Sequence, residues 1–168
     1  MDIYIRPIDI PDALTVLNWE NNPENWDASD NKGEYQLFDI VRMIEESQDI
    51  HKICQGRWMI CDKSNDALIG TTDLFAIDFE AGFATVGILI AEKENRQKGL
   101  ASKALELLEL EANRLELQKM HCAIHPDNDS SIKLFEKVGF KLAGETDEVF
   151  GHNGVIKKAS IYEKWLKK

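Results

Sequence analysis

The spacing of apolar residues changes abruptly in the middle of the chain. The run from Ala84 to Ala91 is short, rich in β-branched residues and free of charge, as is typical of a buried strand. After Gly99, apolar residues return with a period of about 3.6 residues, which indicates an amphipathic helix that continues to about Leu117. The segment between these two elements therefore turns the chain from a strand into a helix.

The same patterns predict the remaining elements and one mixed α/β domain over residues 1–168. Further strands are expected at Ile3–Arg6, Arg57–Asp62, Ala67–Ala76 and Lys119–His125, helices at Ala13–Glu20, Leu37–Ile44 and Asn128–Val138, and a last hairpin of Phe140–Phe150 and Val155–Trp165 around Gly151–Gly154. The central order of strand, long helix and strand predicts one right-handed parallel crossover in a mainly antiparallel sheet.

Composition favours a cytoplasmic protein without a membrane segment. The chain has 168 residues, which suits one domain, and no stretch reaches the roughly 18 apolar residues of a transmembrane helix. The N-terminal sequence M-D-I-Y-I-R-P-I-D lacks the apolar region of an export signal. The three cysteines, Cys54, Cys61 and Cys122, show no C-x-x-C spacing, so we expect reduced thiols and no metal site.

The charge balance restricts the classes of partner. The formal net charge is −10, which repels nucleic-acid phosphates and anionic membranes. A cationic small molecule or a basic peptide would be attracted instead. An acidic surface that serves only solubility is the alternative interpretation.

The turn between the central strand and helix has the composition of an anion site. A helix N-terminus offers unpaired N–H groups and the positive end of the helix dipole, and phosphate binds there when the main chain can come close. Gly99 and Ala101 allow that approach, Ser102 adds a hydroxyl, and Arg96 and Lys98 add positive charge. We therefore predict a pyrophosphate site, with an ordinary exposed loop as the alternative. The turn matches neither G-x-G-x-x-G nor a P-loop.

A second motif lies downstream, in N-D-S-S-I-K-L-F-E-K-V-G-F from Asn128 to Phe140. Together with the turn, this segment resembles the GNAT superfamily of acyl-CoA N-acyltransferases. Arg96, Gly99 and Ala101 match its R/Q-x-x-G-x-G/A loop, and the downstream motif matches its N-x-x-S/A…L-Y/F-E-K-x-G-F segment. The start, I-R-P-I-D-I-P-D, and the tail, F-G-H-N-G-V-I-K-K-A-S-I-Y, are similar to the subgroup of ribosomal-protein N-terminal and spermidine acetyltransferases.

The resemblance implies a fold and a cofactor site. The fold would be a GNAT-type α/β sheet of six to seven strands, mixed but mainly antiparallel, with about four helices and a V-shaped splay that follows a bulge between the fourth and fifth strands. Acetyl-CoA, as co-substrate, would lie in the splay. Its expected contacts are Ile88, Leu89, Ile90, Arg96, Gln97, Lys98, Gly99, Leu100, Ala101, Ser102, Asn128, Ser131 and Lys137.

The reaction implied by the resemblance is direct acetyl transfer from acetyl-CoA to a primary amine. The N–H of Ile90 would stabilise the developing oxyanion, and a base must deprotonate the ammonium before it attacks. Carboxylates that could line the acceptor side are Glu20, Asp73 and Glu92. His125 is a further candidate base, although a strand-end histidine without catalytic function is the alternative.

One residue departs from the family pattern. Many members have Tyr where this chain has Phe135, and that hydroxyl protonates the departing thiolate. Phe135 has no proton to donate, so water, Ser131 or Tyr162 would have to substitute.

The acceptor is predicted only in outline. The acidic balance and the tail favour a polyamine or another small cationic amine, while acetylation of a peptide N-terminus and a non-catalytic acyl-CoA-binding module stay open. The acceptor pocket is expected in the loops around residues 20–35 and the hairpin of the 150s, where sequences vary most freely. Because dimers are common in the family, a homodimer is also among the expectations.

Overall fold

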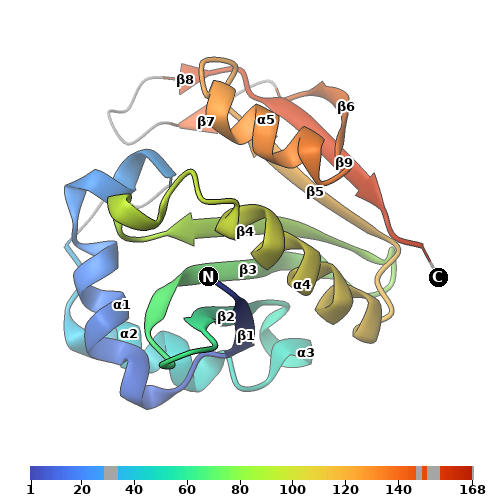
Figure 1. Cartoon of the computed structure of the whole chain (residues 1–168). Helices are drawn as coiled ribbons and strands as arrows, with labels where there is room; N and C mark the ends of the chain where they lie inside the picture. Colours follow the sequence, from blue (N-terminus) through green and yellow to red (C-terminus); the bar gives the residue numbers. More distant parts are fainter. Residues whose placement is uncertain (29–33, 147–148, 151–155, 168) are drawn as a thin grey trace.

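The computed structural model describes residues 1–28, 34–146, 149–150 and 156–167 of the chain. One sheet of seven strands runs through the molecule in the order β1-β2-β3-β4-β5-β9-β6 (Figure 1). Its strands are β1 (Ile3–Pro7), β2 (Gly56–Asp62), β3 (Leu68–Asp78), β4 (Phe83–Ile90), β5 (Lys119–Ile124), β6 (Lys141–Glu145) and β9 (Ser160–Trp165). Only β4 and β5 pair in parallel, so the predicted mainly antiparallel sheet with one parallel crossover is confirmed.

Helices cover both faces of the sheet. They are α1 (Ala13–Glu20), α2 (Leu37–Glu46), α3 (Ile50–Ile53), α4 (Leu100–Arg114) and α5 (Asp129–Lys137). α1 and α2 pack with Met59 and Leu89 on one face, and α4 packs with Ile60 and Ile90 on the other, as the alternation of side chains along a strand requires. No helix in the ranges described above is long and apolar enough to cross a membrane.

Two parts of the chain differ from the predicted elements. α3 was not predicted, because a single turn is too short to show a hydrophobic period; the Asp49 carboxylate accepts a hydrogen bond from the Lys52 N–H at its start. The last hairpin is interrupted. β6 pairs with β9, while β7 (Val149–Phe150) and β8 (Ile156–Lys157) form a separate ribbon. The predicted turn at 151–154 lies outside the described residues.

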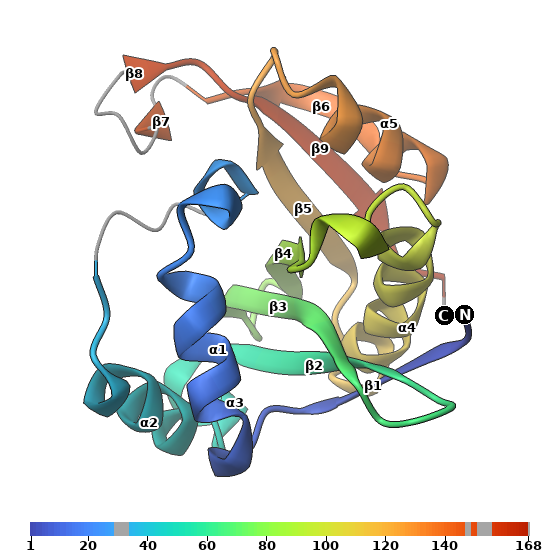
Figure 2. The same ribbon diagram turned by 60° about the vertical axis from the view of Figure 1, so that its left-hand side comes forward.

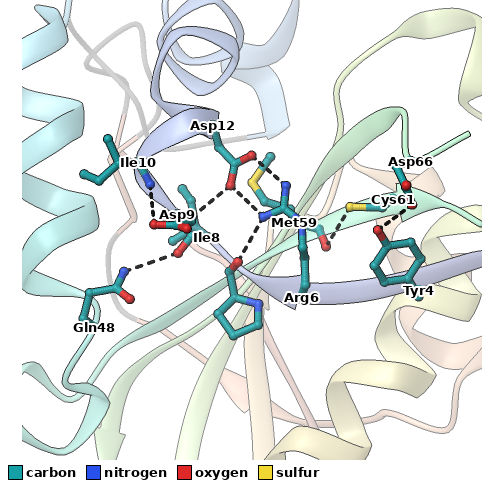
Figure 3. A network of polar contacts seen from close by, with 11 residues as sticks. Tyr4, Arg6, Ile8, Asp9, Ile10, Asp12, Gln48, Met59, Cys61 and Asp66 are labelled. Atoms are coloured by element: carbon teal, nitrogen blue, oxygen red, sulfur yellow. Dashed lines mark hydrogen bonds and ion pairs between the residues drawn. The ribbon is translucent and has the colours of Figure 1, made fainter.

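An ion pair fixes the start of α1 relative to the sheet. The Arg6 guanidinium of β1 donates to both carboxylate oxygens of Asp12, at 2.8 and 2.7 Å, and the Asp9 N–H donates to the same carboxylate at 2.9 Å (Figure 3). Asp12 is buried. This bidentate contact therefore anchors the residue that precedes α1.

Candidate functional site

Strands β4 and β5 separate after a short paired segment. They pair from Phe83–Lys119 to Thr85–His121 and not beyond, although β4 continues to Ile90. Figures 1 and 2 show the two strands spreading apart from this point. The pairing of β3 with β4 has a register shift between Phe75 and Asp78, opposite Thr85 and Phe83 and therefore next to the last rung with β5, and it is regular from Thr85 to Ile90. The predicted V-shaped splay is confirmed.

Main-chain groups of β4 line the gap. The Ala91 N–H donates to the Ile69 carbonyl of β3 at 3.0 Å, so Ala91 faces β3. Because main-chain groups alternate along a strand, those of Leu89 also face β3, whereas those of Ile88 and Ile90 face the gap. Of the three predicted residues of β4, two therefore present hydrogen-bonding groups to the opening.

The turn from β4 to α4 exposes a row of N–H groups. Gln97 and Gly99 have positive φ angles of 60° and 76°. The helical hydrogen bonds begin with the Lys103 N–H, and within the described ranges no group accepts from the N–H groups of residues 97–102. A Cβ on Gly99 would meet nothing within 4 Å, so open space lies beside this residue. This arrangement can hold an anion at the start of a 15-residue helix.

Arg96 points inward rather than toward this open space. Its guanidinium donates to the carbonyl oxygens of Ile90 at 2.9 Å and Ala91 at 3.1 Å, and to Oδ1 of Asn25 at 2.7 Å. Asn25 is buried and also donates to the Trp19 carbonyl at 3.0 Å. Arg96 thus joins the end of β4 to the segment after α1. Lys98, in contrast, is exposed.

The N-terminus of α5 contains the second motif. The Asn128 Oδ1 accepts from the Ser131 N–H at 3.1 Å and from the Ser130 hydroxyl at 3.0 Å, so it caps the helix. The Asn128 side-chain N–H groups make no hydrogen bond to the residues that the structure describes, so they can serve as donors to a ligand. Lys137 lies exposed in the last turn of α5.

Phe135 belongs to the apolar core. It is 5% exposed and packs edge-on against Phe140, with the ring centroids 5.0 Å apart. Tyr162, one of the substitutes considered for the missing hydroxyl, is buried in the same cluster.

On the face of the sheet opposite α4, an ion cluster borders the gap. The Arg57 guanidinium of β2 donates from Nε to Asp73 Oδ1 of β3 at 2.5 Å and from Nη1 to Glu20 Oε1 of α1 at 2.9 Å. All three side chains are at most 16% exposed. Two carboxylates therefore contact one guanidinium. Arg57 was missed in the sequence; the signal was a lone arginine at the start of an otherwise apolar strand.

A hollow of about 320 Å³ extends from the point where the strands separate. The His121 Nε2 lies 2.7 Å from the Thr85 hydroxyl, on the last paired rung, and both residues line the hollow. Burial, followed by the charge of Lys119, lowers the pKa of His121, which favours the neutral imidazole. The alternation of side chains along β5 could have indicated that His121 faces the hollow. It could not have indicated the hydrogen bond between His121 and Thr85.

The other two candidate bases lie apart from the cluster. His125 follows β5 and is partly exposed, with its Nδ1 3.8 Å from a carboxylate oxygen of Asp127. Glu92 accepts a hydrogen bond from the Trp19 indole at 3.3 Å. Of the carboxylates considered, the structure brings together Glu20 and Asp73.

Comparisons with known proteins agree with this geometry. The sequence profile of the acetyltransferase (GNAT) domain matches residues 2–141. The spermidine N(1)-acetyltransferase of Escherichia coli is 24% identical over 162 residues, which cover 94% of this chain and 82% of that protein.

Solved structures share the fold across the chain. The ribosomal-protein-S5-alanine acetyltransferase of Vibrio fischeri superposes with a TM-score of 0.86 at 20% identity, covering 100% of this chain and 95% of the other. The spermidine N-acetyltransferase of Vibrio cholerae, in complex with CoA and spermine, gives a TM-score of 0.83 at 23% identity, covering 98% and 95%.

Proposed function

Because the chain belongs to the GNAT acetyltransferase family, we propose that it transfers the acetyl group of acetyl-CoA to a primary amine of a small cation, with a polyamine as the first candidate. The activity class, an acetyl-CoA-dependent N-acetyltransferase, follows from the family. The acceptor is the part that we infer.

The observation that carries the choice of acceptor is the ion cluster beside the gap. Glu20 and Asp73 both contact Arg57 and place two carboxylates on this side of the sheet, where negative charge attracts an ammonium group. The formal net charge of −10 extends this attraction over the whole surface. The relationship to the Escherichia coli spermidine N(1)-acetyltransferase supports the same choice.

The residues around the gap fit acetyl-CoA. The N–H groups of residues 97–102 would hold the pyrophosphate, with Lys98 adding charge, because no group in the described ranges accepts from them and space is open beside Gly99. The main chain of Ile88 and Ile90 would pair with the pantetheine arm, together with the Asn128 amide. The co-substrate supplies an acetyl group activated as a thioester, and the Ile90 N–H would stabilise negative charge on its carbonyl oxygen.

The inward direction of Arg96 changes its expected contribution. Its hydrogen bonds to the end of β4 and to Asn25 support a positioning function for the turn, rather than a direct charge contact with the pyrophosphate. Ser131 and Lys137 stay predicted contacts of the cofactor, and the homodimer stays a prediction as well.

An assay with a panel of amines tests the proposal. Purified protein and acetyl-CoA are incubated with spermidine, spermine, putrescine, a neutral primary amine and a peptide with a free N-terminal alanine, and CoA release is measured. We expect the polyamines to give the highest kcat/KM and a strong decrease with added salt. A preference for the peptide would overturn the proposed polyamine acceptor and favour a peptide N-terminus. Binding of CoA without turnover of any amine would overturn the assignment as an enzyme.

A further inference from the structure

The carboxylate of Asp73 lies beside Gly87 of β4, close to the point where the gap opens. Asp73 lies opposite Gly87 in the pairing of β3 with β4. A Cβ built on Gly87 would lie 3.3 Å from Asp73 Oδ2. The carboxylate therefore occupies the position that a side chain of β4 would fill, two residues beyond the last rung that β4 shares with β5.

The two oxygens of Asp73 have different surroundings. Oδ1 accepts the Arg57 Nε–H at 2.5 Å, which fixes the orientation of the carboxylate. Oδ2 receives no hydrogen bond from the part of the chain that the structure describes, although the side chain is only 12% exposed. A buried carboxylate with one oxygen anchored and the other held beside Gly87 of β4 is arranged to meet a donor that enters from outside.

We propose that Asp73 accepts the proton of the acceptor ammonium, an assignment that rests on the function proposed above. An N–H bond of the ammonium breaks, an O–H bond forms at Oδ2, and the lone pair stays on nitrogen. That lone pair forms the C–N bond to the thioester carbonyl carbon while the C–S electrons go to sulfur. A second nitrogen proton goes to the thiolate, so the products are an amide and the CoA thiol, and Asp73 returns its proton to solvent.

The electrostatic surroundings of Asp73 suit this function. Burial raises the pKa of Asp73, and the negative charge of Glu20 on α1 acts in the same direction, while Arg57 on β2 opposes both. An alkyl ammonium has an ordinary pKa of about 10.4, so raising the pKa of the acceptor carboxylate makes the proton transfer less unfavourable. Arg57 is a positioning residue, because it holds Oδ1 and leaves Oδ2 for the amine.

The test compares Asp73→Asn with wild type, using acetyl-CoA and the best amine of the panel. A general base contributes roughly 10²–10⁴-fold, so kcat/KM should fall at least about 100-fold at pH 7. The ratio of the wild-type kcat/KM to that of the variant should shrink at least about tenfold by pH 10. At that pH, close to the pKa of the amine, a large part of the amine is already neutral in solution and needs no base. The rise in Tm with CoA should be unchanged. Asp78→Asn, on the exposed end of the same strand, is the matched control and should behave as wild type.

A second variant keeps the proposal testable if Asp73→Asn does not fold. Gly87→Ala adds a methyl group 3.3 Å from Oδ2 and should lower kcat/KM at least about tenfold while the CoA shift is retained; its control is Gly144→Ala, where a Cβ has no neighbour within 4 Å. Three outcomes would overturn the assignment. They are a kcat/KM of Asp73→Asn within threefold of wild type, a wild-type-to-variant ratio of kcat/KM that does not change with pH, and a fully active Gly87→Ala. Failure of the wild type to acetylate any amine would instead overturn the proposed function.

Discussion

The two sides of the gap are built in different ways. On the cofactor side, the groups that face the opening are main-chain N–H donors of β4 and of residues 97–102, all within one short stretch of chain. On the acceptor side, the groups are side chains of α1, β2 and β3, and Arg57 lies 37 residues from Glu20 and 16 from Asp73. A site made of consecutive main-chain groups depends on local conformation, whereas a site made of distant charges depends on the whole fold.

The largest expected effect is on the acceptor side. Arg57→Leu removes the charge that Glu20 and Asp73 share and leaves two carboxylates in a poorly hydrated position. Breaking such a buried ion cluster should lower the free energy of unfolding by about 3–5 kcal/mol. Urea denaturation measures the loss. Arg42→Leu breaks the exposed pair with Glu46 and should cost less than about 1 kcal/mol; equal losses would show that the cluster is not buried in solution.

The next effect is on the cofactor side. Gly99→Asn keeps a residue that tolerates positive φ but adds a side chain in the middle of the row of N–H groups, where the main chain must approach the pyrophosphate closely. Each lost hydrogen bond to a charged group is worth about 1.5–3 kcal/mol, so the Kd for CoA should rise at least about tenfold.

Thermal unfolding with CoA checks this prediction. At 100 times Kd, CoA should stabilise the wild type by about 2.7 kcal/mol, and much of this shift should disappear in the variant. Gly139→Asn is the matched control, because Gly139 also has a positive φ and follows the C-terminal end of α5. This variant should keep the stabilisation by CoA. An unchanged shift in Gly99→Asn would mean that the pyrophosphate binds elsewhere.

A smaller effect is expected at Arg96 and Lys98, and it distinguishes a residue that positions the turn from one that attracts the pyrophosphate by its charge. Arg96→Lys keeps the charge but cannot reproduce the three hydrogen bonds to Ile90, Ala91 and Asn25. We expect a loss of about 1–3 kcal/mol in stability and a weaker affinity for CoA that is nearly independent of salt. Lys98→Gln should give a salt-dependent loss instead, measured by calorimetry at two NaCl concentrations. If Arg96→Lys binds CoA as wild type does, the positioning function is wrong.

The smallest effect is expected at Phe135. The ring is buried against Phe140, so Phe135→Tyr adds a hydroxyl to an apolar cluster and should change kcat less than about threefold. Steady-state kinetics with the best amine measures this. A gain of tenfold or more would mean that the present chain lacks a general acid which the tyrosine restores.

Sequence patterns were sufficient for most of the elements and for the turn between β4 and α4. The apolar run of β4, the period of α4 and the glycine between them are local signals, and the structure has both elements within a few residues of their predicted bounds. They were insufficient for Arg96, whose positive charge suggested a phosphate contact. The reason lies far along the chain: Asn25 and the carbonyls at the end of β4 form a set of acceptors that only the fold assembles.

By itself, the sequence determined the order of strands and helices and the presence of a turn that can bind an anion, because hydrophobic period and glycine conformation act over a few residues. The tertiary structure decided where β5 leaves β4 and which carboxylates meet Arg57. It also decided that Gly87 leaves room for Asp73. Buried charges require partners, and those partners come from whichever elements the packed sheet brings to the same place.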